Sequence, residues 1–276
     1  MRINLLCIGD VVGRPGRFVV SQALPRLVQE HDLHCVICNA ENVAGGSGLT
    51  PQLYDKLLRY GVHVITMGDH VYRRGEIIPI LETSNHIVRP ANLPSAAAGK
   101  TVTVYETALG PKVAVISLLG RLFMKTHADC PFSTVSRLLR QLDSDVRIVV
   151  VDMHAEATSE KIAMGWFLDG RVSALVGTHT HVPTADERVL PNGTAYITDL
   201  GMTGPYDGVL GRRKERVLHS LTTGMPTPFD VAVNDVRLSG ALIQVESDTG
   251  RATHIERICL DETSGLFSTA DSGAEP

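Results

Sequence analysis

Two histidines one residue apart, His179 and His181, lie in the segment Gly177-Thr178-His179-Thr180-His181, directly after the apolar residues 172–176. Two imidazoles just past a strand end can point at a common centre where the backbone turns, as a pair of adjacent metal ions requires. A single His-x-His pattern is weak evidence in a chain with 11 histidines, because some close spacing arises by chance. The interpretation is stronger here because other predicted strands end in similar residues. These are Asp10, Glu41 with Asn42, Asp69 with His70, and His154.

This set mixes carboxylate and amide oxygens with imidazole nitrogens. The mixture favours two first-row divalent ions over a Cys-rich structural zinc site or an all-oxygen calcium site. Two ions about 3.5–4 Å apart can hold the attacking and leaving oxygens of a phosphoryl group and make hydroxide available near neutral pH. Such a pair needs a bridging carboxylate, for which Glu41 is the candidate by position. A nearby acid must also protonate the leaving oxygen, and His70, beside a predicted ligand, is the candidate for that role.

Strands and helices alternate along the parts of the chain that must position these residues. Three strand and loop units come first, with helices between them, and the same order returns in the second half. Strands are predicted over residues 3–8, 34–39, 62–67, 146–151 and 172–176, and helices over residues 133–142 and 158–168. Because the loops of such units gather at one edge of the sheet, we expect a layered α/β domain with the candidate ligands at that edge.

The remaining strands are predicted as hairpins or short segments. A short strand starts at residue 87, hairpins cover residues 101–118 and 188–197, one or two strands lie in residues 231–246, and a last strand covers residues 253–260. From Asp261 the residues are small and polar. We therefore expect one domain over residues 1–260 and a disordered tail over residues 261–276.

Composition indicates an ordinary soluble globular protein. The chain has 276 residues, 43% hydrophobic and 20% charged, with a net charge of -4. This balance gives no sign of a nucleic-acid partner. The one basic cluster (Arg212, Arg213, Lys214 and Arg216) is predicted to be a solvated helix face. The first residues lack a cleavage site, and no apolar run is long enough for a membrane span, so we expect a cytoplasmic protein without a membrane partner.

The five cysteines are an odd number and are spread along the chain. Cys35 and Cys38 form a CxxC pattern, but no second CxxC accompanies it. Reduced, buried thiols are therefore expected rather than redox or zinc chemistry.

Four motifs resemble those of the calcineurin-like metallophosphoesterases, in the order of that family. They are Ile8-Gly9-Asp10, Gly68-Asp69-His70, the isolated His154, and Gly177-Thr178-His179-Thr180-His181-Val182. Four longer segments are similar to the narrower YmdB-like branch, so that the resemblance covers about residues 1–260. These are Asn39-Ala40-Glu41-Asn42-Val43-Ala44-Gly45-Gly46, Arg89-Pro90-Ala91-Asn92, His154-Ala155-Glu156-Ala157-Thr158-Ser159-Glu160-Lys161, and Thr198-Asp199-Leu200-Gly201-Met202-Thr203-Gly204-Pro205.

The resemblance implies a four-layer α/β/β/α sandwich with a binuclear centre of iron or, second, manganese. It implies phosphodiesterase activity on a small-molecule substrate, a 2′,3′- or 3′,5′-cyclic nucleotide, by a metal-bridging hydroxide. Matching by motif position, one metal would take Asp10, Glu41, Asn42 and His181. The other would take Glu41 as a bridge, with Asp69, His154 and His179, and His70 would donate a proton to the leaving ribose oxygen.

One departure from the family pattern concerns Asp69, because the family usually has Asn in this Gly-Asn-His turn. The extra negative charge should raise the pKa of the bridging water and hold the ions more tightly, so turnover or metal preference would change. Residues 45–48 and 201–208 are rich in glycine and are compatible either with phosphate contacts or simply with tight turns.

Other functions remain open from the sequence alone. The same metal pair would serve a phosphomonoesterase or phosphoprotein phosphatase. Because Asp69 departs from the family pattern, a nucleotide-binding regulator with little turnover is a second alternative. The sequence specifies neither the residues that bind the substrate nor the oligomeric state, so a homo-oligomer stays open.

Overall fold

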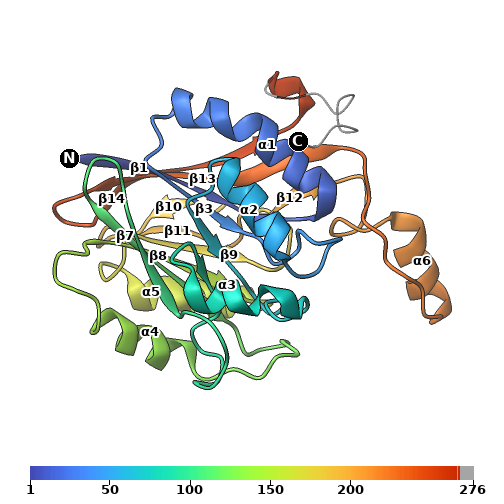
Figure 1. Cartoon of the computed structure of the whole chain (residues 1–276), viewed down its shortest axis with the longest axis horizontal. Helices are drawn as coiled ribbons and strands as arrows, with labels where there is room; N and C mark the ends of the chain where they lie inside the picture. Colours follow the sequence, from blue (N-terminus) through green and yellow to red (C-terminus); the bar gives the residue numbers. More distant parts are fainter. Residues whose placement is uncertain (266, 268–276) are drawn as a thin grey trace.

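Two β-sheets pack face to face in the computed structural model, which describes residues 1–265 and 267 (Figure 1). The larger sheet has the strand order β2-β12-β13-β1-β3-β4-β5, with β14 paired to β13, and the smaller has the order β10-β11-β9-β8-β7-β6. The strands of the larger sheet are β1 (Arg2–Ile8), β2 (Asp10–Val11), β3 (Cys35–Asn39), β4 (Val64–Thr66), β5 (Ile87–Val88), β12 (Met202–Pro205), β13 (Val236–Glu246) and β14 (Ala252–Leu260). Those of the smaller sheet are β6 (Val102–Glu106), β7 (Lys112–Leu119), β8 (Ile148–His154), β9 (Ala174–Thr178), β10 (Arg188–Val189) and β11 (Ala195–Ile197).

Helices cover the outer face of each sheet. The larger sheet packs against α1 (Gly13–Glu30), α2 (Pro51–Arg59) and α3 (Ile78–Thr83), which follows the short η1 (Gly75–Ile77). The smaller sheet packs against α4 (Pro131–Leu139) and α5 (Thr158–Leu168). This arrangement confirms the predicted four-layer α/β/β/α sandwich. A further helix, α6 (Lys214–Thr223), stands apart from the sheets at the right of Figure 1.

Apolar and polar residues do not alternate regularly along strand β1. Leu6 and Ile8 face the layer of helices, whereas Leu5 and Cys7 face the second sheet. Both faces of the strand are therefore buried, as is usual for strands in the middle of an α/β domain.

Parallel pairing brings the functional residues together. Strands β1, β3, β4 and β5 run parallel in the larger sheet, and β7, β8, β9 and β11 run parallel in the smaller one. The carboxyl ends of parallel strands meet at one edge of a sheet. Seven of the eight candidate residues lie at the ends of β3, β4, β8 and β9 or in the loops that follow these strands. The eighth, Asp10, lies just past the end of β1.

Several predicted elements are confirmed. The helix predicted over residues 158–168 is α5. The hairpins predicted over residues 101–118 and 188–197 are the antiparallel pairs β6–β7 and β10–β11. The structure also shows that Thr50 caps α2 by accepting a hydrogen bond from the Leu53 N–H.

Other expectations were wrong in part. The glycine-rich residues 201–208 do not only form tight turns, because Met202–Pro205 form β12, which pairs with the short strand β2. Arg212 does not belong to an exposed helix face, since α6 starts only at Lys214 and the Arg212 guanidinium donates to backbone carbonyls. A disordered tail over residues 261–276 stays a prediction; of this segment the structure describes the 3-10 helix η2 (Glu262–Ser264) and Phe267, which is buried. The rest of that expectation concerns residues 266 and 268–276, which lie outside the described residues.

All five cysteines are free, and Cys35 and Cys38 are buried as predicted. Within the described part of the chain, every helix is too short or too polar to cross a bilayer.

Candidate metal centre

Four side chains from the ends of four different strands converge at one edge of the parallel strands. Glu41, Asp69, His154 and His179 each offer one ligand atom, and these atoms all lie within 4.8 Å of one another. His154 Nε2 lies 3.2 Å from Asp69 Oδ1 and 3.4 Å from Glu41 Oε2. His179 Nδ1 lies 3.0 Å from His154 Nε2 and 3.4 Å from Asp69 Oδ1. These are the residues expected from the sequence to share one metal, and their cluster can bind a metal ion.

The residues expected at a second metal adjoin this cluster on the other side of Glu41. His181 Nε2 lies 3.7 Å from Asp10 Oδ1 and 3.2 Å from Asn42 Nδ2. The Asn42 amide is in turn 3.2 Å from Glu41 Oε1. One oxygen of Glu41 thus faces His154 and the other faces the second group, which is the position that a bridging carboxylate needs.

The amide of Asn42 is turned with its nitrogen toward Glu41 and His181 and its oxygen toward His70 Nδ1, at 2.8 Å. A cation would be met by the amide oxygen. The ligand role expected for Asn42 therefore requires a half-turn of its amide about the terminal bond.

Asp10 gives the clearest indication that a cation fits this place. Its side chain is fully buried, and Oδ1 accepts no hydrogen bond, while Oδ2 accepts one from the His179 N–H at 3.1 Å. Burial raises the pKa of Asp10 to about 7, and the negative charge of Glu41 adds to this although His154 opposes it. An unsatisfied buried carboxylate oxygen is costly, and a bound cation would remove that cost.

Hydrogen bonds on the far side of two histidines aim their other nitrogen at the centre. His181 Nδ1 donates to the Leu210 carbonyl at 3.2 Å. His154 Nδ1 lies 2.8 Å from Thr178 Oγ1, whose hydroxyl donates to Asp152 at 2.6 Å. In both rings this leaves Nε2 as the ligand atom, the arrangement usual for metal-binding histidines. Burial also lowers the pKa of His181 to about 4, so the ring is neutral at pH 7.

The electrostatic field of the clustered Glu41 and Asp69 carboxylates favours positive charge. Burial opposes ionisation of Glu41 and Asp69, but the neighbouring histidines outweigh it and lower the pKa of both carboxyls. Burial likewise opposes a proton on His154, yet Glu41 and Asp69 raise the pKa of this imidazole well above its usual value. The clustered carboxylates thus favour a proton on His154. A divalent cation would be stabilised by the same negative charges.

Local backbone geometry leaves room for an ion. A Cβ atom at Gly68 would lie 2.3 Å from both Glu41 Oε2 and His154 Nε2, so any larger residue would intrude into the centre. His179 and His181 have φ angles of 92° and 65°, a left-handed region that non-glycine residues seldom adopt. Strain of this kind persists where surrounding contacts enforce it, and it is common at functional sites.

Those contacts come from residues that sequence reasoning did not single out. Asp199 accepts hydrogen bonds from the Thr180 N–H at 3.3 Å and the Thr180 hydroxyl at 2.6 Å, and from the Lys161 ammonium at 2.6 Å. Both Lys161 and Asp199 are buried. Their only sequence signal was their place inside the family-like segments.

A second supporting network surrounds Asp152 behind His154. Its carboxylate accepts hydrogen bonds from Asn39, Thr66 and Thr178. Burial raises the pKa of Asp152, although His154 and these donors oppose the shift. Sequence reasoning also missed Glu156, whose carboxylate lies 3.2 Å from His179 Nε2 at the rim.

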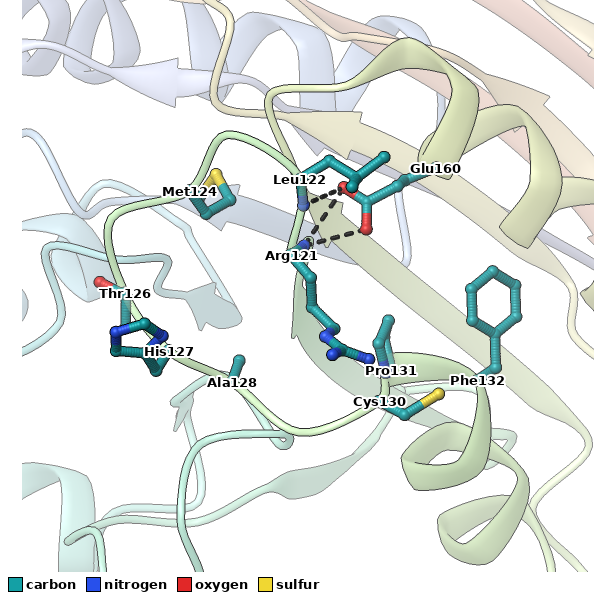
Figure 2. A pocket seen from close by; sticks show the side chains of 10 residues that line it. All are labelled: Arg121, Leu122, Met124, Thr126, His127, Ala128, Cys130, Pro131, Phe132 and Glu160. Atoms are coloured by element: carbon teal, nitrogen blue, oxygen red, sulfur yellow. Dashed lines mark hydrogen bonds between the residues drawn. The ribbon is translucent and has the colours of Figure 1, made fainter.

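The cluster opens into a cavity of about 360 Å³. His70, His179 and His181 line it together with Leu210 and Phe229. A larger cavity of about 560 Å³ lies between the loop after β7 and the start of α5 (Figure 2). Its carboxylate, Glu160, is engaged by the N–H groups of Arg121 and Leu122, and it is not among the four clustered ligands.

Comparisons with known proteins agree with this geometry. The family model described as YmdB-like protein matches residues 6–258. A Bacillus subtilis (strain 168) protein named 2′,3′-cyclic-nucleotide 2′-phosphodiesterase is 45% identical, with 96% of this chain and 100% of that protein covered. A crystal structure of a hypothetical protein from Thermus thermophilus has a TM-score of 0.87 at 38% identity, covering 94% of this chain and 99% of the other. A structure described as a novel phosphatase of Mycoplasma pneumoniae has a TM-score of 0.89 at 34% identity, covering 95% and 94%.

Proposed function

The chain belongs to the YmdB-like protein family and is a phosphoester hydrolase, and from this premise we propose that it cleaves 2′,3′-cyclic nucleotides at a binuclear metal centre. The observation that carries the proposal is the convergence of Glu41, Asp69, His154 and His179 within 4.8 Å. The name of the Bacillus subtilis relative supports the 2′,3′-cyclic diester as substrate. In the reaction water adds to phosphorus, the bond to the 2′ oxygen breaks, and that oxygen takes up a proton.

The residues that would hold the two ions are those expected from the sequence. Asp10, Asn42 and His181 would hold one ion, Asp69, His154 and His179 the other, and Glu41 both. When bound, such ions supply charge stabilisation of the phosphoryl oxygens and acidify water near neutral pH. The mixed oxygen and imidazole ligands suit first-row divalent ions. Iron first and manganese second are proposed because the resemblance to the metallophosphoesterases implies them. We include residues 1–260 in this catalytic unit as a single domain.

His70 is the proposed proton donor to the leaving oxygen. Its Nδ1 lies 3.2 Å from Glu41 Oε1, a contact that does not depend on the orientation of the Asn42 amide, so Nε2 is the nitrogen proposed to lose a proton. Burial opposes protonation, but the hydrogen bond and charge of Glu41, with the charge of Asp69, outweigh it and raise the pKa of His70 above its usual value. This shift favours the protonated imidazole that a general acid needs.

Replacement of His70 by Ala is expected to lower kcat for 2′,3′-cyclic AMP by about 10²-fold, the lower part of the range for loss of a general acid. The low part of the range is expected because the side chain is 26% exposed, so water can deliver a proton instead. Metal content by mass spectrometry should stay at two ions per chain. Unchanged kcat with full metal content would remove His70 from the mechanism.

Replacement of Asp69 by Asn tests the departure from the family pattern. One negative charge is removed without a change of shape, so the metal-bound water should become more acidic and the ions should be held less tightly. We expect two ions to be retained at saturating metal and the pH optimum of kcat to move to lower pH. A pH–rate profile and metal affinity equal to those of the wild type would show that Asp69 does not contact the ions.

A panel of four substrates separates the proposed function from its alternatives. Metal-loaded protein is assayed with 2′,3′-cyclic AMP, 3′,5′-cyclic AMP, bis-p-nitrophenyl phosphate and p-nitrophenyl phosphate. The proposal requires the 2′,3′-cyclic diester to be cleaved with the highest kcat/KM. Preference for the monoester would indicate a phosphatase, and tight nucleotide binding without turnover would indicate a regulator.

A further inference from the structure

Two unlike groups of side chains line the cavity beside the metal centre. The polar wall contains His70 and four of the candidate ligands, Glu41, Asn42, His179 and His181. The apolar wall comes from residues 209–229, which contribute Val209, Leu210, Val217 and Phe229. Leu210 and Phe229 are 49% and 45% exposed, so large apolar side chains are left uncovered next to a highly charged centre. An exposed apolar surface inside a cavity is a common feature of a binding site for an apolar part of a ligand.

Two residues of the apolar wall, Val217 and Phe229, lie in a loop that is tied at its base, and Val209 and Leu210 come just before it. Arg212 and Val231 form a β-bridge, the Arg213 N–H donates to the Asp230 carbonyl at 2.9 Å, and the Ala232 N–H donates to the Gly211 carbonyl at 2.9 Å. Residues 213–230, including α6, therefore leave the body of the fold and return at one point, as Figure 1 shows for α6.

Two hydrogen-bonded links fix the apolar wall relative to the metal centre. The Leu210 carbonyl accepts from His181 Nδ1, a candidate ligand. The Arg212 guanidinium donates to the carbonyls of Gly45 and Phe229 at 3.1 and 3.0 Å, and also to that of Gly46. Arg212 thus joins the loop after β3, which carries Glu41, to the wall that carries Phe229. Because both of its terminal nitrogens donate to backbone oxygens, this arginine acts as a positioning residue.

We propose that Leu210 and Phe229 form the binding surface for the nucleobase of the substrate, in the same cavity as the centre that holds its phosphate. This inference rests on the proposed function. A phosphate held by the polar wall would leave the rest of a mononucleotide within this cavity, and the cavity volume of about 360 Å³ is in the range of small-molecule sites. Aromatic side chains bind bases by stacking, and this contact tolerates different bases because every base has a π face.

The wall therefore predicts weak discrimination among bases. From residues 209–229, the side chains that line the cavity are apolar except for Arg212, and its guanidinium is already engaged. No polar side chain of the apolar wall is therefore available to form specific hydrogen bonds with the edge of a base. Purines should bind more tightly than pyrimidines because they cover more of the apolar surface.

The test compares a substrate with a base and one without. Steady-state kinetics are measured for 2′,3′-cyclic AMP and for ribose 2′,3′-cyclic phosphate, using the metal-loaded full chain. For Phe229→Ala we expect the ratio of kcat/KM for the two substrates to fall about 10-fold, mainly through KM, because a stacking contact is lost. Phe229→Trp should keep the ratio near that of the wild type. Phe123→Ala is the matched control, since Phe123 is 85% exposed and does not line this cavity.

Each outcome decides one of the two proposals. If wild-type protein cleaves both substrates with equal kcat/KM, or if Phe229→Ala lowers both equally, the base surface is wrong while the phosphodiesterase stands. If wild-type protein cleaves neither, the proposed function fails and the base surface with it. A ratio that changes as much in Phe123→Ala as in Phe229→Ala would also overturn the assignment.

Discussion

Replacement of Glu41 by Gln should remove most of the catalytic activity. The side chain is 1% exposed, and its two oxygens face different groups of candidate ligands, so its charge serves both proposed ions. Gln keeps the shape and one oxygen but loses the charge that binds a divalent ion. The loss should be on the order of 10⁴-fold in kcat/KM, since metal charge stabilisation supplies several kcal/mol and each 1.4 kcal/mol is about tenfold.

Metal analysis distinguishes this effect from a general loss of folding. Protein prepared without nickel affinity steps should carry two ions in the wild type and fewer than one in Glu41→Gln. Glu106→Gln makes the same chemical change at an exposed position at the end of β6 and should alter neither quantity. A Glu41→Gln protein that retained two ions and turned over at the wild-type rate would disprove the bridging role.

The fold and most of the candidate centre could be predicted because their signals are local. Strands such as β1 and β8 are buried on both faces and therefore appear as continuous apolar runs. The residues that end or follow each run then lie at the common edge of a parallel sheet. This is why Asp10, Glu41 and His154 could be placed from the sequence before any contact was known, although their role as ligands remains a prediction.

The remaining features depend on partners that are distant in sequence. Strands β2 and β12 are too short to give a pattern, and they form because β12 pairs with both β2 and β13. Arg212 resembled part of an exposed basic face, yet its donors meet carbonyls of a loop far away along the chain. Lys161 looked like an ordinary polar residue of α5, but its side chain is fully buried. No local pattern predicts such contacts.

Replacement of Lys161 by Met should be strongly destabilising. Lys161 and Asp199 are 0% exposed, and their charged atoms are 2.6 Å apart. Removing one member of a buried ion pair leaves the other charge uncompensated, at a cost of about 3–5 kcal/mol in the free energy of unfolding. Because Asp199 also holds the backbone and hydroxyl of Thr180, the strained turn between His179 and His181 should loosen as well.

Urea denaturation of the metal-free protein measures the stability change without the contribution of bound ions. The double variant Lys161→Met with Asp199→Asn should be less destabilised than the single variant, because no charge is then left buried. Lys112→Met is the control: Lys112 pairs with Asp145 at 2.7 Å, but both side chains are exposed to water, which screens their attraction. If Lys161→Met cost no more than Lys112→Met and left metal affinity unchanged, the buried pair would have no part in holding the histidine turn.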